Sequence, residues 1–144
     1  MRVILFESQG DWAALVRPRT PAGVALVETR SIDETLERLC DVPNALVLVQ
    51  WQPARGRQLV DLLQSVRRDF VAAHAAVLGN REPRDLEILV REAGAIEYFD
   101  STRQIASLMA LISHHIEQST TSAPAAESDF SLEDRIRANL PWGD

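Results

Sequence analysis

Polar side chains that could carry chemistry follow four of the apolar runs in the sequence. The four places hold Glu7 and Ser8, Gln50 and Trp51, Gly79 and Asn80, and finally Asp100, Ser101 and Thr102. Carboxylate and amide oxygens could bind a hard cation, and a hydroxyl group activated by a base could act as a nucleophile. No histidine or acid stands at a recognised spacing from these hydroxyl groups, and the motifs G-x-S-x-G, G-x-G-x-x-G and G-x-x-x-x-G-K do not occur. We therefore expect a polar site without enzymatic activity.

The charged residues narrow the chemistry further. All 15 basic residues are arginine, and the net charge is −6. The lack of lysine excludes a Schiff base, a P-loop lysine and a lysine that clamps a phosphoryl group. The arginines are scattered, which disfavours a nucleic-acid partner. A single cysteine, Cys40, allows neither an internal disulfide nor a cysteine-based zinc site, and we expect it to be a small core residue. One carboxylate at Glu7 is a poor magnesium site, so we expect neither a metal nor a cofactor.

Strands and helices alternate along residues 1–118, and the polar places fall where the strands end. Short apolar runs predict five strands, at residues 3–6, 24–27, 45–49, 73–78 and 96–99. Apolar residues at helical spacing predict a helix after each strand. We expect Asp11 to cap the first helix and Ser31 with Glu34 to form a capping box at the second. The helix after residue 83 is expected to turn an apolar stripe inward, formed by Leu86, Leu89, Val90 and Ala93.

This alternation predicts an α/β fold with a parallel sheet between two layers of helices. Parallel strands require crossover connections, and these are almost always right-handed. The run "ALVLV" at residues 45–49 is apolar throughout, as expected for a strand that is buried on both faces. In open sheets of this kind, functional residues gather at the carboxyl ends of the strands. The four polar places are therefore expected to meet at one rim of the sheet.

The composition changes after residue 118. Residues 1–118 hold 16 acidic and 13 basic residues, whereas residues 119–144 hold five acidic and only two basic residues. We expect a domain at 1–118, a flexible linker at 119–130 and an acidic tail at 131–144 that could form a short helix. Apolar residues of the tail recur at Leu132, Ile136 and Leu140 and are followed by Trp142. The tail is either a docking peptide for a partner or a disordered end.

The segment "EAGAIEYFDST", residues 92–102, resembles the last helix–strand segment of bacterial response-regulator receiver domains. The order and length of the elements over residues 1–118 are also similar to that family. The resemblance implies a flavodoxin-like, three-layer α/β sandwich with a five-stranded parallel sheet in the strand order 2-1-3-4-5.

The positions that work in a receiver domain are altered in this sequence. The acidic pair after the first strand is replaced by Glu7 and Ser8, and the phosphorylated aspartate is replaced by Val49 or Gln50, depending on the alignment. Gly79 stands in place of the hydroxyl residue after the fourth strand, and Ser101 stands in place of the lysine after the fifth. Neither Val49 nor Gln50 could form an acyl phosphate. The resemblance therefore implies a degenerate receiver, a pseudo-receiver that cannot be phosphorylated.

Such domains retain a surface for docking or dimerisation, and the resemblance places it on the fourth helix, the fifth strand and the fifth helix. Its members here would be Arg84, Glu87, Arg91, Glu97, Tyr98, Asp100 and Arg103. We expect a non-catalytic signalling or scaffolding module that acts by protein–protein contact, with a homodimer among its candidate assemblies.

The alternative is a sensor of a nucleotide or metabolite. In this case Trp51 would stack on a ring, and Asn80, Ser101 and Thr102 would form hydrogen bonds with the ligand. Trp51 is equally suited to covering the helix that follows it. No apolar run approaches the ~20 residues of a membrane span, and we expect a cytoplasmic protein.

Overall fold

The structure is a computed structural model, and it describes residues 2–127. The strands are β1 Arg2–Phe6, β2 Ala25–Thr29, β3 Leu46–Gln50, β4 His74–Leu78 and β5 Glu97–Phe99. The helices are α1 Asp11–Val16, α2 Ile32–Asp41, α3 Gly56–Asp69, α4 Arg84–Ala93 and α5 Ile105–Glu127, with short 3-10 turns at Arg17–Arg19, Pro53–Arg55 and Thr102–Gln104. The chain divides into two compact units between residues 112 and 113, and the sheet belongs to the first.

The five strands form one parallel sheet in the order β2-β1-β3-β4-β5. β3 is the central strand, and β1 lies beside it with Phe6 opposite Val49. Every strand is joined to the next by at least one helix, as parallel pairing requires. Both the predicted fold class and the predicted strand order are confirmed.

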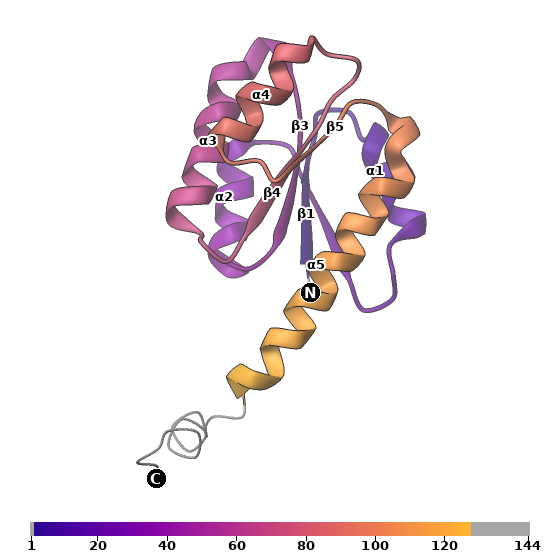
Figure 1. The fold of residues 1–144 in the computed structure, drawn as a ribbon, viewed down its shortest axis with the longest axis vertical. Helices are drawn as coiled ribbons and strands as arrows, with labels where there is room; N and C mark the ends of the chain where they lie inside the picture. The colour runs from indigo at the N-terminus through magenta and orange to yellow at the C-terminus, as the bar shows by residue number, and fades with distance from the viewer. Residues whose placement is uncertain (1, 128–144) are drawn as a thin grey trace. The chain divides into compact units, whose positions relative to one another are not determined.

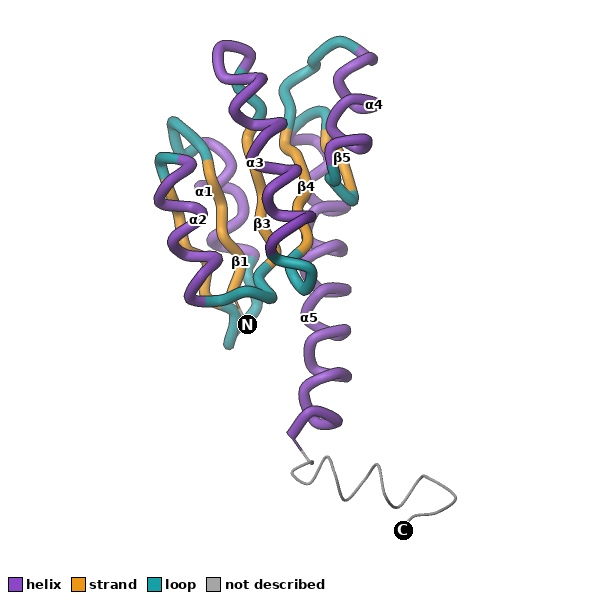
Figure 2. The backbone as a smooth tube through the Cα atoms, turned by 90° about the vertical axis from the view of Figure 1, so that its left-hand side faces the viewer, coloured by secondary structure: helices purple, strands orange, loops and turns teal. Residues whose placement is uncertain are grey.

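The core is divided between the two faces of the sheet because successive side chains of a strand point to opposite faces. Ile4, Phe6 and Val49 belong to a buried cluster that α2, α3 and α4 cover. Leu5 and Leu48 are equally buried but lie outside this cluster. Figure 1 shows α2, α3 and α4 on one side of the sheet and α1 and the start of α5 on the other, and Figure 2 shows the first group in front of the strands.

The helix starts agree with the sequence at α2 and differ at α1. The Ser31 hydroxyl accepts a hydrogen bond from the Glu34 N–H at 3.0 Å, whereas the Glu34 carboxylate accepts from the Arg30 N–H at 2.9 Å rather than from that of Ser31. Asp11 does not cap α1, because the cap is Gly10 with φ 91° and Asp11 is the first helical residue. A left-handed residue at this point suits glycine.

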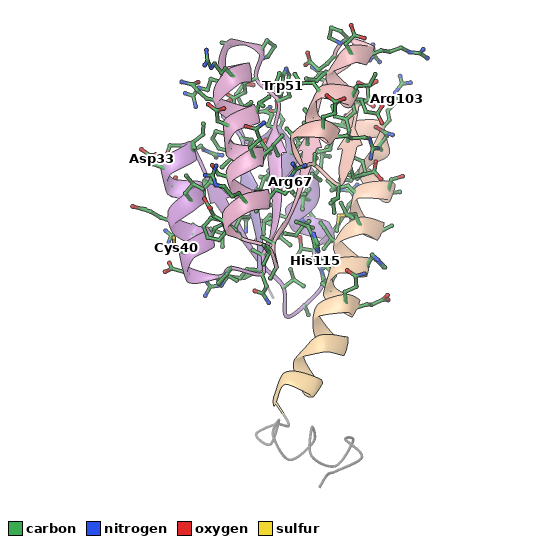
Figure 3. All side chains as sticks on the ribbon, turned by 60° about the vertical axis from the view of Figure 1, so that its left-hand side comes forward. Asp33, Cys40, Trp51, Arg67, Arg103 and His115 are labelled. Atoms are coloured by element: carbon green, nitrogen blue, oxygen red, sulfur yellow. The ribbon has the colours of Figure 1, made fainter. Side chains whose placement is uncertain are left out.

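Three further expectations about the helices were wrong. Leu89 is 44% exposed, whereas Leu86, Val90 and Ala93 are buried as expected. Cys40 is exposed and lies on the outer side of α2 (Figure 3). Helix α5 continues to Glu127, so residues 119–127 are helical where a linker was expected. This segment contains four Ser or Thr residues and Pro124 and has low helix propensity, but it continues a helix that is already formed and so needs no new nucleation step.

Candidate functional site at the carboxyl rim of the sheet

The carboxyl ends of β3 and β4 and the segment after β5 meet α1 at a shallow depression of about 460 Å³. Its lining comprises Asp11, Trp12, Ala14, Leu15, Gln50, Gly79, Asn80 and Thr102. The sequence therefore placed four of these residues correctly at the rim. It missed the contribution of α1, whose residues are close to the rim only because the chain turns back at Gly10.

Glu7 is not available as a ligand, because its carboxylate is fully buried against the start of α1. Oε1 accepts a hydrogen bond from the Trp12 N–H at 3.0 Å, and Oε2 accepts from the Ala13 N–H at 2.7 Å. Both donors belong to the first turn of a helix, where backbone N–H groups have no partner within the helix. Gly10 is the N-cap residue, but the Glu7 carboxylate supplies the side-chain acceptor that was expected from Asp11 and connects the end of β1 to α1.

Gln50 is the residue that β3 delivers to the rim. Its Oε1 accepts hydrogen bonds from the Ser8 N–H at 2.9 Å and from the Ser8 hydroxyl at 3.2 Å. Val49 is 1% exposed and packs in the cluster under α2, α3 and α4. The two alternatives for the end of β3 are thereby separated, since Val49 points into the core and Gln50 ties β3 to the segment after β1.

Tyr98 is buried, and Gly79 makes room for it. A Cβ atom at Gly79 would lie 2.9 Å from Cζ of Tyr98 and closer still to its hydroxyl oxygen, distances that real side chains do not adopt. The Tyr98 hydroxyl donates to Oδ1 of Asp100 at 3.3 Å. The expectation that Tyr98 belongs to an exposed interaction face was wrong, because the ring fills the space that Gly79 leaves open.

Backbone hydrogen bonds connect the loop between β4 and α4 to the end of β5. The Gly79 N–H donates to the Phe99 carbonyl at 2.6 Å, and the Arg81 N–H donates to the Asp100 carbonyl at 2.7 Å. Arg81 has a φ of 59°, the only positive φ of a non-glycine residue in the described part of the chain. A left-handed arginine costs free energy, so neighbouring contacts must hold it in place.

Trp51 covers a helix start and does not line the depression. Its ring packs against the core cluster, and a Cβ atom at Gly56 would lie 3.1 Å from Cζ2 of the indole. Figure 3 shows Trp51 near the start of α3, toward the same end of the molecule as Arg103. Of the two roles that the sequence left open for Trp51, this geometry supports the covering role.

The exposed side of α4 and β5 combines ion pairs with apolar side chains. Arg91 donates to Glu87 at 3.0 Å and to Glu97 at 2.6 Å, and the hydrogen bond to Glu97 raises the pKa of Arg91 above its ordinary value. Ile88, Leu89 and Ile96 are 60%, 44% and 41% exposed. Arg84, Asp100 and Arg103 are exposed as expected. The apolar members were missed, although Ile88 stands out in the sequence as an isoleucine opposite the buried stripe of Leu86 and Val90.

Other predicted residues lie apart from this arrangement or outside the described residues. The Ser101 hydroxyl accepts from the Arg103 N–H at 3.2 Å and does not line the depression. The tail residues Leu132, Ile136, Leu140 and Trp142 lie outside the described part of the chain. Within residues 2–127, no three His, Cys, Asp or Glu side chains are grouped so that they could hold a metal ion. Over the same range, no helix has the length and apolar character that a membrane crossing requires.

The stability of the fold should fall above about pH 10. Burial, followed by the charges of Asp100, Glu82 and Glu87, raises the pKa of Tyr98 above the value of about 10 of a tyrosine in an unfolded chain. The folded state therefore binds the Tyr98 proton more tightly than the unfolded chain does. The resulting stabilisation is complete below about pH 10 and is lost as the pH rises toward the folded-state pKa of Tyr98. The urea midpoint, measured across this range, should decline more steeply for the wild type than for Tyr98→Phe. Equal slopes would contradict the link between Tyr98 ionisation and folding.

Comparisons with known proteins concern the fold. No protein-family model matches the chain, and no curated protein matches it in sequence. A CheY-like protein (TadZ) from Pseudomonas aeruginosa matches with a TM-score of 0.64 at 18% identity, over 80% of this chain and 99% of that one. NtrX from Brucella abortus, crystallised in complex with ADP, matches with a TM-score of 0.69 at 13% identity, over 92% of this chain but only 30% of NtrX. The chain therefore has the fold of CheY-like receiver proteins.

Proposed function

We propose that this protein is a non-catalytic signalling module that resembles a receiver domain, cannot be phosphorylated at its rim and acts by protein–protein contact. The main support for the proposal is that the rim side chains form hydrogen bonds within the protein. Gln50 is tied to Ser8, and the carboxylate of Glu7 is buried against α1. Phosphoryl transfer needs a nucleophile, a bound metal and a cation that neutralises the phosphoryl oxygens. The chain has no lysine for the last role.

Acetyl phosphate or beryllofluoride with magnesium should leave the amide NMR spectrum unchanged. These reagents act through a carboxylate nucleophile and its metal, and the rim offers neither in an accessible form. We expect Gln50→Asp to remain unreactive as well, because it restores one part of three. A shift centred on residues 7–8, 49–51 and 101–102 in the wild type would contradict the proposal. Reaction of Gln50→Asp alone would show that the acceptor was the single missing part.

The exposed side of α4 and β5 supports contact with another protein. We define the α4–β5 face by Ile88, Leu89 and Ile96 with the ion-paired residues Glu87, Arg91 and Glu97. Apolar side chains beside polar ones that remain exposed are typical of interaction sites. The face carries both signs of charge, so acidic groups of one copy could meet basic groups of another. We infer that the α4–β5 face binds a second copy of the chain. We also propose that the protein is cytoplasmic.

A small-ligand sensor is the second candidate function, and the depression at the rim favours it. Its volume of about 460 Å³ lies within the usual range for small-molecule sites. Gln50, Asn80 and Thr102 supply polar groups, and Trp12 rather than Trp51 is the aromatic residue of the lining. Titration with nucleotides should then change the NMR signals of Asn80 and Thr102. Unchanged signals at millimolar nucleotide would remove this candidate for that class of ligand.

A further inference from the structure

A groove between α2 and α3 is larger than the depression at the rim, with a volume of about 530 Å³. Its lining comes from the start of α2, from α3 and from the turn before α3, and comprises Ser31, Ile32, Asp33, Leu36, Arg55, Gln58, Asp61, Leu62 and Ser65. Figures 1 and 2 show the two helices on the same side of the sheet. The groove shares no residue with the depression or with the α4–β5 face, so it is a separate surface.

The floor of the groove is apolar. Ile32 and Leu36 are one helical turn apart on α2, and both are half-buried against the core cluster. Leu62 of α3 is 2% exposed and belongs to the same lining. An apolar side chain seated in the groove would therefore cover apolar surface that the domain leaves partly exposed to water.

The charged side chains of the groove have no partners within the domain. Over residues 2–127, the carboxylates of Asp33 and Asp61 and the guanidinium group of Arg55 form no hydrogen bond or ion pair. All three residues are exposed at the edges of the groove. The occupant that fits this surface combines an apolar side chain with cations for the two carboxylates and an anion for the arginine.

The C-terminal segment of the chain has this combination of residues. Residues 131–144 lie outside the described part of the chain, and their sequence is "SLEDRIRANLPWGD". Ile136 stands between Arg135 and Arg137, and the acidic pair Glu133–Asp134 precedes them. The apolar residues of the segment recur at every fourth position, the spacing of one helix face. Recognition of a helix in a groove uses this spacing, with apolar anchors below and charged residues at the edges.

We infer that the groove between α2 and α3 binds the segment 131–144 of a second copy of the chain. In this contact Ile136 covers the apolar floor, Arg135 and Arg137 face the two carboxylates, and the acidic pair faces Arg55. The start of α5 lies on the other side of the sheet from α2 and α3 (Figure 1), so the segment that follows α5 is supplied by a neighbouring copy. The inference extends the proposed self-contact to a second surface and does not depend on the α4–β5 face.

A synthetic peptide of residues 128–144 tests the contact on the full chain. Labelled protein that carries Ile136→Glu, which disables its own segment, should show amide NMR shifts at Ile32, Leu36 and Asp61 when the peptide is added. The signals of the α4–β5 face should stay in place, and binding should weaken as the salt concentration rises. A scrambled peptide of the same composition is the control. No shift at millimolar peptide, or equal shifts with the scrambled peptide, would overturn the inference.

Charge reversal in the groove tests the assigned pairs. Asp61→Arg in the same protein should weaken peptide binding by about fivefold or more, because an attraction becomes a repulsion. A peptide with Arg135→Asp and Arg137→Asp should bind this variant more tightly than the unaltered peptide does. Glu37→Arg is the matched control, since Glu37 is an exposed acid of α2 outside the lining. Equal weakening by the two protein variants, or no rescue by the reversed peptide, would overturn the inference.

The concentration dependence distinguishes a neighbouring copy from the same chain. The groove signals of the wild type should move toward those of the peptide-bound form as its concentration rises, whereas those of Ile136→Glu should not. A difference between the two proteins that is the same at every concentration would place the segment on its own copy and overturn the inference. Loss of the groove contact in these experiments, together with weaker association of Ile88→Glu, would refute this inference alone and leave the α4–β5 face as proposed.

Discussion

Glu7→Ala is expected to lower the free energy of unfolding by about 3 kcal/mol. The carboxylate is fully buried and accepts from two backbone N–H groups at the start of α1. Each buried donor that loses its partner costs about 1–3 kcal/mol, and hydrogen bonds to charged acceptors lie at the upper end of that range. Glu7→Gln should also destabilise the fold, because one of its two terminal atoms becomes a donor that faces another donor. Urea unfolding of the variants measures both effects.

Asp11→Ala is the matched control for this prediction. Asp11 is an acidic residue of the same helix start, but it is exposed and has no role in capping. Its favourable interaction with the helix dipole is worth less than about 1 kcal/mol. Equal losses for Glu7→Ala and Asp11→Ala would show that the hydrogen bonds from the first turn of α1 to Glu7 do not stabilise the fold. Stabilisation of the wild type by magnesium, absent in Glu7→Gln, would show instead that Glu7 binds a cation.

Ile88→Glu is expected to weaken self-association by at least about tenfold. Ile88 is the most exposed apolar residue of the α4–β5 face, and a glutamate in its place would put an uncompensated charge in an apolar contact. Tenfold corresponds to about 1.4 kcal/mol. Sedimentation of the wild type and the variant over a range of concentrations gives the two dissociation constants. The fold should be unaffected, because Ile88 is 60% exposed in the structure.

Val71→Glu provides the control for a new charge on an exposed apolar residue. Val71 is 82% exposed and lies in the connection between α3 and β4, outside the α4–β5 face. Its substitution should leave the dissociation constant unchanged. A wild-type protein that stays monomeric at high concentration would exclude a second copy as the partner. Equal weakening by both substitutions would show that the net charge, rather than the face, controls association.

The rim residues lie on two sides of the sheet, and this separation explains why one candidate function has more support than the other. The depression lies on the α1 side, where Gln50 and Asn80 contribute polar groups, whereas Trp51 packs on the side of α3. The aromatic and polar residues that the sequence suggested as one ligand site are therefore separated by the sheet edge. The α4–β5 face, in contrast, has its apolar and charged residues on adjacent elements. Contact with another protein is for this reason the function that we propose first.

Most of the fold could be predicted from the sequence, because periodicity reports burial within each element. The five apolar runs and the helical stripes between them identify all five strands and all five helices of the described residues. The predictions fail where the sequence pattern and the contacts in the folded protein disagree. Leu89 fits the spacing of an inner stripe, yet it lies at the edge of that stripe and is 44% exposed. At the start of α1, Gly10 has a left-handed conformation and Glu7 accepts hydrogen bonds from the first turn. The sequence pattern pointed to Asp11 instead, because an acidic residue at a helix start is a common cap.

The sequence by itself determined the parallel sheet, the absence of lysine and the absence of an aspartate at the end of β3, since these depend on residue types and their order. Tertiary structure decided what the rim residues do. It assigned the carboxylate of Glu7 to α1, joined Gln50 to Ser8 across 42 positions and placed Tyr98 in the space that Gly79 leaves. The physical reason is that a side chain's partners are set by close packing between segments that are distant along the chain, which no local pattern contains.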